Sequence, residues 1–102
     1  MAKLVVLYKK AADPAAFDSY YFSTHAPKAK RIPGLRRYEV SSGSVSTPQG
    51  ESAYQLVAEL HFDSLAALRT GLAAPEGQAA AADLANFAQA GVELLMFDSK
   101  DV

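Results

Sequence analysis

The sequence contains no cysteine among its 102 residues. A disulfide framework, a thiolate nucleophile and a cysteine-ligated zinc site are therefore all excluded. Long apolar runs are also missing, since none approaches the roughly 20 residues that a membrane-spanning helix needs. The N-terminus leads directly into a strand-like run, without the pattern of a signal peptide, so we expect a cytoplasmic protein with no membrane partner.

Strong charge of either sign is absent too. The net charge is −1, which provides no field to attract nucleic acid, so we expect no nucleic-acid partner. The spacings GxSxG, GxGxxG and HExxH are missing, as are a phosphate-binding loop and an EF-hand. Because the chain has two histidines, a Ser-His-Asp triad is not excluded, although no sequence motif identifies a nucleophile. What remains is an ordinary globular composition, with 50% apolar and 21% charged residues, which predicts one domain over residues 1–102.

The order of elements predicted from periodicity and from Gly, Pro and capping signals is β-α-β-β-α-β. This order is typical of an α+β, ferredoxin-like fold, with one four-stranded antiparallel sheet and both helices on a single face. A polar stretch at 46–52 predicts a hairpin loop between the second and third strands. Strands are expected at 3–9, 35–45, 52–62 and 91–97, and helices at 14–32 and 63–90, with the second helix restarting after Pro75.

The third predicted strand alternates in character along its length. Alternation places Tyr54, Leu56, Ala58, Leu60 and Phe62 on one face, and Gln55, Val57, Glu59 and His61 on the other. The first and last strands, by contrast, are apolar on both sides. An apolar sheet face left uncovered by helices usually marks an interface, so we expect a homodimer packed sheet to sheet.

His25 is the candidate catalytic residue. Phe17, Tyr21, His25, Ala29 and Ile32 follow one another at spacings of four, four, four and three, which places His25 on the helix face that points at the sheet. Pro27 removes a backbone donor from this helix and predicts a kink or a restart near Ala26. His25 is then either a packed histidine bonded to a tyrosine or carbonyl, or an acid/base group in a pocket, where a pKa near 6.5 would suit proton transfer.

Tyrosines surround this histidine in the sequence. Each ring alone is consistent with core packing, but together with His25 they indicate a pocket with apolar walls and a few polar tips, as small-molecule sites have. We therefore expect a small-molecule ligand and no cofactor. The candidate ligand-binding residues are Phe17, Tyr20, Tyr21 and Tyr38.

Two other clusters have simpler interpretations. Glu59 and His61 stand two apart on one strand face and could ligate a metal together with His25, but such pairs are frequent by chance, so no metal is predicted. Half of the basic residues fall within ten positions, where they could attract an anion but are more simply explained as a solvated helix end. These residues are Lys28, Lys30, Arg31, Arg36 and Arg37.

The stretch F…YYFSTHAP…IPGLRRYEVSSG, followed by a polar hairpin and then ADLANF, resembles the EthD family, named for a protein associated with ethyl tert-butyl ether degradation. The resemblance covers about residues 3–98 and is most specific over 20–38, with Asp83 and Phe87 as a second, weaker match. The resemblance implies a dimeric α+β barrel. It also implies that His25 is the family's histidine, that Pro27 is the proline beside it, and that Pro33 and Gly34 form the family's turn.

The resemblance leaves the reaction open. Related dimeric α+β barrels include cofactor-free oxygenases, lactone isomerases, polyketide cyclases and dehydratases, and haem-degrading enzymes, but a shared fold is only an analogy for function. Haem degraders of this fold rely on a tryptophan, and this chain has none. The remaining expectations are an isomerase, dehydratase, cyclase or oxygenase, a non-catalytic accessory protein of an oxidative catabolic pathway, or a fold kept for assembly.

Overall fold

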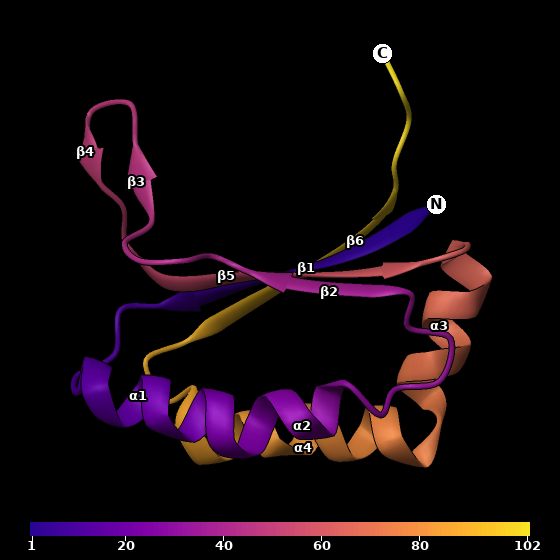
Figure 1. The fold of residues 1–102 in the computed structure, drawn as a ribbon, viewed down its shortest axis with the longest axis horizontal. Coiled ribbons are helices and arrows are strands. Elements are labelled where there is room, and N and C mark those ends of the chain that lie inside the picture. Colours follow the sequence, from indigo (N-terminus) through magenta and orange to yellow (C-terminus); the bar gives the residue numbers. More distant parts are fainter.

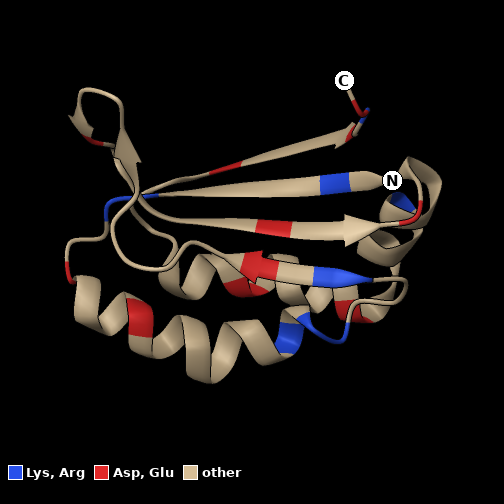
Figure 2. Cartoon of the chain, turned by 45° about the horizontal axis from the view of Figure 1, so that its top comes forward, with Lys and Arg blue, Asp and Glu red and all other residues tan.

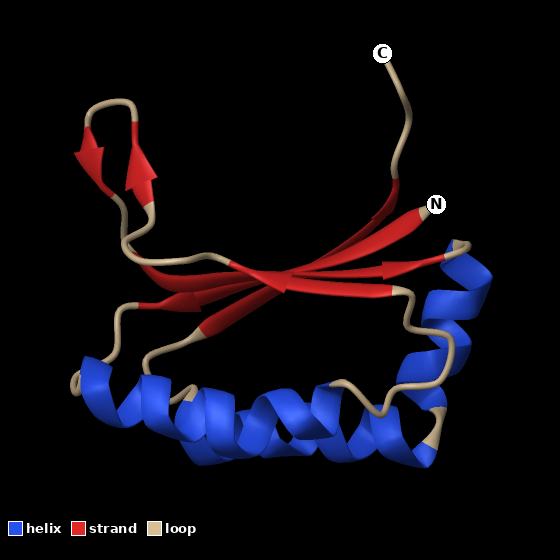
Figure 3. Ribbon diagram, in the orientation of Figure 1, coloured by secondary structure: helices blue, strands red, loops and turns tan.

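The computed structural model describes all residues, 1–102, and has a layer of helices packed on one face of a four-stranded antiparallel sheet (Figures 1 and 3). The strand order is β2-β5-β1-β6. The predicted ferredoxin-like topology is confirmed. The elements are β1 (Ala2–Lys9), α1 (Pro14–Tyr20), η1 (Tyr21–His25), α2 (Ala26–Ala29), β2 (Arg37–Val40), β3 (Ser46–Thr47), β4 (Gly50–Glu51), β5 (Tyr54–Phe62), α3 (Leu65–Ala73), α4 (Pro75–Phe87) and β6 (Val92–Asp98).

Strand β1 is central and pairs with β5 on one side and β6 on the other. Its side chains alternate between buried and half-buried, as period-two geometry requires. The buried ones face the helices and meet a matching row on β5, so the core lies between sheet and helices. The two rows are Ala2, Leu4, Val6 and Tyr8 on β1, and Phe62, Leu60, Ala58 and Leu56 on β5.

The prediction that Tyr54 lies on the same sheet face as Leu56 is wrong. The register shifts between Tyr8 and Lys9, so that Lys9 pairs with Tyr54 and Gln55 becomes an extra residue. Tyr54 consequently lies with the residues of the outer face, the sheet face opposite the helices: its ring lies under the Lys9 ammonium, and its hydroxyl donates to Glu93. Strict alternation cannot predict such a shift, because it assumes no inserted residue.

The first helical segment is one continuous rod with a wide turn in its middle (Figure 1). Asp13 caps its start by accepting from the backbone N–H of Ala16, and Pro14 occupies the first turn. Residues 21–25 form a π-helical turn, in which the N–H of Ala26 reaches back to the carbonyl of Tyr21. Pro27 has no N–H to donate and its ring crowds the preceding turn, which accounts for the wide turn and for the predicted restart at Ala26.

Helices α3 and α4 meet in a corner at the end of the sheet, and α4 then runs back alongside α1 and α2 (Figure 1). Ser64 caps α3 through the N–H of Ala67, and Pro75 starts α4. The corner is tight because glycines allow close backbone approach. A Cβ atom at Gly77 would meet the carbonyl oxygen of Gly71 and the backbone of Leu72.

The second strand is shorter than the predicted 35–45. Its ladder ends at Val40, and the backbone N–H of Ser41 makes a last bond to Val57. The following Ser-Ser-Gly sequence leaves the sheet, with Gly43 at φ 75°, a conformation that suits glycine. The predicted hairpin loop contains a short two-stranded ladder, β3 with β4, which projects from the main sheet (Figure 3). No helix is both long and apolar enough to span a bilayer.

Candidate functional site

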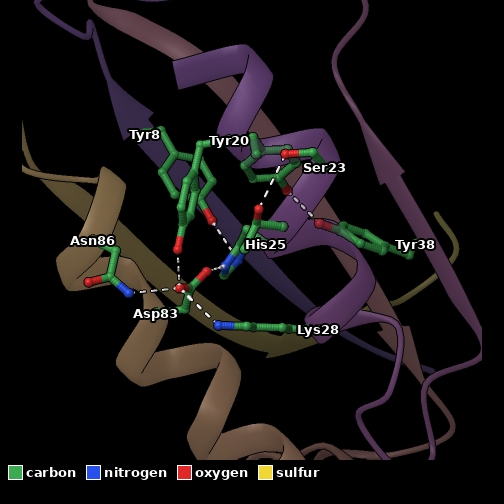
Figure 4. A network of polar contacts seen from close by, with 10 residues as sticks. Tyr8, Tyr20, Ser23, His25, Lys28, Tyr38, Asp83 and Asn86 are labelled. Carbon is green, nitrogen blue, oxygen red and sulfur yellow. Dashed lines mark hydrogen bonds and ion pairs between the residues drawn. The ribbon is translucent and has the colours of Figure 1, made fainter. Parts of the chain in front are cut away.

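His25 lies at the end of the π-helical turn and is buried against the sheet, with 5% of its surface exposed. Both of its ring nitrogens have partners (Figure 4). Nδ1 lies 3.0 Å from Oδ2 of Asp83 on α4, and Nε2 lies 3.5 Å from the hydroxyl of Tyr8 at the end of β1. Three elements that are distant in sequence therefore converge on this imidazole.

Asp83 is the centre of the polar network in Figure 4. It is 2% exposed and accepts four hydrogen bonds. Tyr20 donates at 2.6 Å, Asn86 at 2.9 Å and Lys28 at 3.2 Å to Oδ1, while His25 holds Oδ2. A buried carboxylate with this many donors is compensated, as buried charges must be.

These contacts set the protonation states. Burial acts to raise the pKa of Asp83, but the hydrogen bonds from Tyr20, Asn86, His25 and Lys28 outweigh it and hold the pKa well below its usual range. Burial lowers the pKa of His25 below its ordinary value, against the opposing effect of Asp83. At neutral pH the carboxylate is ionised and the imidazole neutral. Nδ1 then carries the proton that bonds Asp83, and the lone pair of Nε2 faces Tyr8.

A second tyrosine pair stands beside the histidine. The hydroxyls of Tyr21 and Tyr38 lie 2.5 Å apart, and the ring of Tyr21 packs at 5.3 Å from the imidazole. Burial raises the pKa of Tyr8, Tyr21 and Tyr38 above the ordinary value, so all three hydroxyls keep their protons at neutral pH. They can therefore act as neutral hydrogen-bond donors.

A cavity between the sheet and the helices joins these groups. The volume of the cavity is about 50 Å³, and about 440 Å³ when the solvent space at its open mouth is included. Its walls are mostly apolar, since fourteen of the sixteen lining residues are hydrophobic. The polar atoms around it come from His25 and the tyrosines Tyr8, Tyr21 and Tyr38. Such a lining suits an apolar molecule with one or two oxygen atoms.

The predicted site residues divide into two groups. Tyr21, His25 and Tyr38 line the cavity. Phe17 and Tyr20 do not: Phe17 packs in the core against Tyr8, and Tyr20 directs its hydroxyl at Asp83. The basic segment is largely engaged with carboxylates, because Lys28 bonds Asp83, Arg36 bonds Asp63 and Arg37 bonds Glu39.

Two residues of the site were not among the predicted ones. Tyr8 belongs to the buried alternating row of β1, where a polar tip at the strand end is the only signal. Asp83 lies on a buried helical stripe with Gly77, Ala80 and Phe87. Because an aspartate is rarely buried unless its charge is paired, its place on this stripe could have indicated a buried polar contact. The candidate metal pair of the third strand, Glu59 and His61, lies across the sheet from the cavity, so His25 is not part of it.

The arrangement can move a proton. A neutral imidazole that is oriented by a carboxylate can accept a proton at Nε2, and the resulting imidazolium is stabilised by the same carboxylate. The tyrosine hydroxyls can donate to an oxygen on which negative charge develops.

Comparison with known proteins gives a consistent result. The family sequence model of the EthD domain matches residues 9–91 of this chain. An uncharacterised 11.0 kDa protein of Rhodococcus erythropolis, from the thcB-thcC intergenic region, is 42% identical over 102 residues, which is 100% of this chain and 98% of that protein.

Solved structures agree with the fold. A crystal structure of an ethyl tert-butyl ether degradation (EthD) family protein from Bacillus halodurans is similar with a TM-score of 0.90 and 37% identity, covering 98% of this chain and 99% of the other. SnoaB, a cofactor-independent oxygenase from Streptomyces nogalater, shares the fold with a TM-score of 0.65 and 24% identity, covering 99% of this chain and 94% of the other. The fold is also shared by a Bacteroides fragilis protein that is described as dimeric and ferredoxin-like, with a TM-score of 0.65 and 19% identity, covering 96% of this chain and 95% of the other.

Proposed function

The chain belongs to the EthD family, and from that premise we propose that it binds a small, mostly apolar, oxygen-bearing molecule in the cavity and transfers a proton on it without a cofactor. The observation that carries the proposal is the hydrogen-bonded series Asp83–His25–Tyr8, which ends at the cavity. A histidine that only filled space would be satisfied by a neutral acceptor such as a backbone carbonyl, whereas the Asp83 carboxylate also stabilises the imidazolium that forms when Nε2 accepts a proton.

The proposed step begins with a carbon acid. When the ligand binds, the Tyr8 hydroxyl gives up its long, 3.5 Å contact with Nε2 of His25, and Nε2 takes a proton from the carbon next to a carbonyl. The electron pair of the broken C–H bond forms a C=C bond, and the π pair of the carbonyl moves onto the carbonyl oxygen. Tyr21 or Tyr38 donates a hydrogen bond to that oxygen. Return of the proton to another carbon completes an isomerisation, while loss of a hydroxyl group as water completes a dehydration. A positioned base of this kind contributes on the order of 10²–10⁴ in rate.

An oxygenase is the second candidate, and the fold shared with SnoaB favours it. The first step would be the same, because cofactor-free oxygenation needs a carbanion that can react with O₂. A non-catalytic accessory protein of an oxidative catabolic pathway would bind the same kind of molecule and leave its C–H bonds intact.

We also infer that the protein works as a homodimer. Strand β6 exposes large apolar side chains on both of its faces, among them Leu95 at 51% and Phe97 at 43%. These two pair in register with Val5 and Lys3 on the outer face of the sheet. A second copy packed sheet to sheet would remove this surface from water.

Deuterium exchange tests the proton transfer directly. Two enolisable probes, 2-tetralone and α-angelica lactone, are incubated with the protein in D₂O, and incorporation at the α-carbon is followed by NMR. Wild-type protein should accelerate exchange with at least one probe. The H25Q variant should lose most of that acceleration, by a factor of about 10²–10⁴.

Ser23→Ala supplies the matched control. Ser23 lies on the same turn as His25, and its hydroxyl bonds only Thr24, so S23A should exchange like wild type. If H25Q and S23A exchange equally well, His25 is not the base. If both probes raise the melting temperature of wild-type protein without any exchange, the accessory-protein interpretation replaces the enzymatic one.

A further inference from the structure

Three ionisable side chains meet on the outer face of the sheet, away from the cavity. Glu39 lies on β2, and Glu59 and His61 lie on β5; we call them the outer-face cluster. One atom from each lies within 4.8 Å of the others. Figure 2 shows the acidic positions of β2 and β5 near the middle of the sheet, with basic positions beside them. The cluster shares no residue with the proposed proton-transfer site.

The two carboxylates face each other directly. Glu39 and Glu59 are register partners in the antiparallel ladder of β2 and β5. Like charges in that position destabilise a sheet, because the side chains stand about 5 Å apart. Such a pair calls for a compensating positive charge between its members.

His61 points into this pair with a free nitrogen. The residue is 9% exposed, and its Nε2 atom is buried without any hydrogen-bond partner. Nε2 lies 3.3 Å from Oε1 of Glu59 and 3.8 Å from Oε1 of Glu39, and neither contact is a hydrogen bond. A buried polar atom without a partner is uncommon and costs stability, so a missing partner is indicated.

We propose that the outer-face cluster binds a divalent first-row transition-metal ion through Nε2 of His61 and one oxygen each of Glu39 and Glu59. Metal–nitrogen and metal–oxygen bonds of about 2.0–2.2 Å in a tetrahedral site place ligand atoms roughly 3.3 Å apart. The observed separations of 3.3 and 3.8 Å are therefore close to those of a bound ion. Imidazole with carboxylates is the ligand set of Zn²⁺ and its neighbours rather than of Ca²⁺.

Neighbouring residues orient the proposed ligands. Arg37 donates to Oε2 of Glu39 at 2.9 Å, which leaves Oε1 directed at His61. Lys3 stands 3.9 Å from Oε1 of Glu59. Arginine on the second carboxylate oxygen is the kind of contact that holds a ligating carboxylate in place. These two cations also define the rival interpretation, an ion-pair network in which Arg37 and Lys3 neutralise the two glutamates without a metal ion.

Metal-binding measurements on the purified protein distinguish the proposed metal site from the ion-pair network. Protein treated with EDTA and then freed of it is titrated with ZnCl₂ by calorimetry, and with CoCl₂ by visible absorption, at pH 7.5. Wild-type protein should bind one ion per chain, and bound Co²⁺ should show a ligand-field band. The H61Q and E39Q variants should bind at least about tenfold more weakly.

Two controls keep the result specific. Glu93→Gln changes a carboxylate on the same sheet face but outside the cluster, and H25Q removes the other histidine; both should bind as wild type does. Glu39 is exposed, so E39Q remains informative if H61Q fails to fold. Absence of Zn²⁺ and Co²⁺ binding at millimolar concentrations, or equal binding by E39Q and wild type, would overturn the proposal and leave the ion-pair network. Deuterium exchange by His25 is independent of either result.

Discussion

Asp83 organises more of this protein than any other single side chain. Its carboxylate joins α4 to α1, η1 and α2 through Tyr20, His25 and Lys28. It also decides which nitrogen of His25 carries the proton, and therefore whether that residue can act as a base. One buried charge thus ties helix packing to the proposed chemistry.

Substituting Asp83 with Asn should separate these two roles. The amide oxygen can still accept from Tyr20 or Lys28, but the amide nitrogen facing His25 would donate to Nδ1 and move the imidazole proton to Nε2. We expect D83N to lose proton-transfer activity while it stays folded, with an unfolding free energy about 2 kcal/mol below wild type at pH 7. Urea denaturation and deuterium exchange measure the two effects.

The lowered pKa of Asp83 determines how the stability difference between wild type and D83N depends on pH. A group whose folded-state pKa lies below its ordinary value of 3.8 contributes stability that is present above pH 3.8 and is lost as the pH falls toward the folded-state value. The stability gap between wild type and D83N should therefore shrink below pH 3.8. Asp18→Asn, at an exposed aspartate, is the control, and a gap independent of pH would contradict the lowered pKa.

The helical elements depend on local exceptions to regular geometry. The π-helical turn at residues 21–25 absorbs Pro27 while keeping both Tyr21 and His25 buried. The corner between α3 and α4 depends on glycine, because the backbone of one helix lies against the first turns of the next. Both exceptions bring α4, and hence Asp83, alongside the turn that carries His25.

Substituting Gly77 with Ala should destabilise the corner. Alanine alone would favour the helix by about 1 kcal/mol. Its methyl group would instead collide with the backbone of Gly71 and Leu72, which cannot rotate away as a side chain can. Overpacking of this kind costs about 1–3 kcal/mol, so we expect a net loss of stability in urea denaturation. A more stable G77A protein would show that the corner can relax.

The whole molecule has one covered sheet face and one open one (Figure 3). Helices bury the inner rows of β1 and β5, while β6 keeps apolar side chains exposed on both of its faces, Leu95 and Phe97 among them on the outer one. A face that combines these side chains with the outer-face cluster is unusual for an isolated subunit. The inferred homodimer accounts for the apolar part.

Substituting Leu95 with Lys should weaken that dimer. The ammonium would have to be buried between the two sheets, which is costly without a partner. We expect a shift from dimer to monomer in light scattering at micromolar concentration. Ala79→Lys adds the same charge on the exposed side of α4 and should leave the mass unchanged. A wild-type protein that is already monomeric under these conditions would contradict the homodimer.

The amino-acid sequence by itself determined the order of elements and the buried side of the first helix. Both depend on local periodicity, and the stripe from Phe17 to Ile32 is buried as predicted. The sequence also named Tyr21, His25 and Tyr38 as candidate site residues, but only the structure shows that all three line one cavity. The sequence could not show the end of β2 or the register shift at Gln55, since both depend on competition for ladder hydrogen bonds.

Only the tertiary structure decided which groups meet His25. Tyr8 lies 17 positions away and Asp83 lies 58 positions away, and long-range packing of α4 against the π-helical turn brings them together. The same holds for Glu39 and Glu59, which are paired by strand register rather than by sequence spacing. Periodicity specifies which face of an element is buried, whereas the partners of a buried polar atom are set by how separate elements pack.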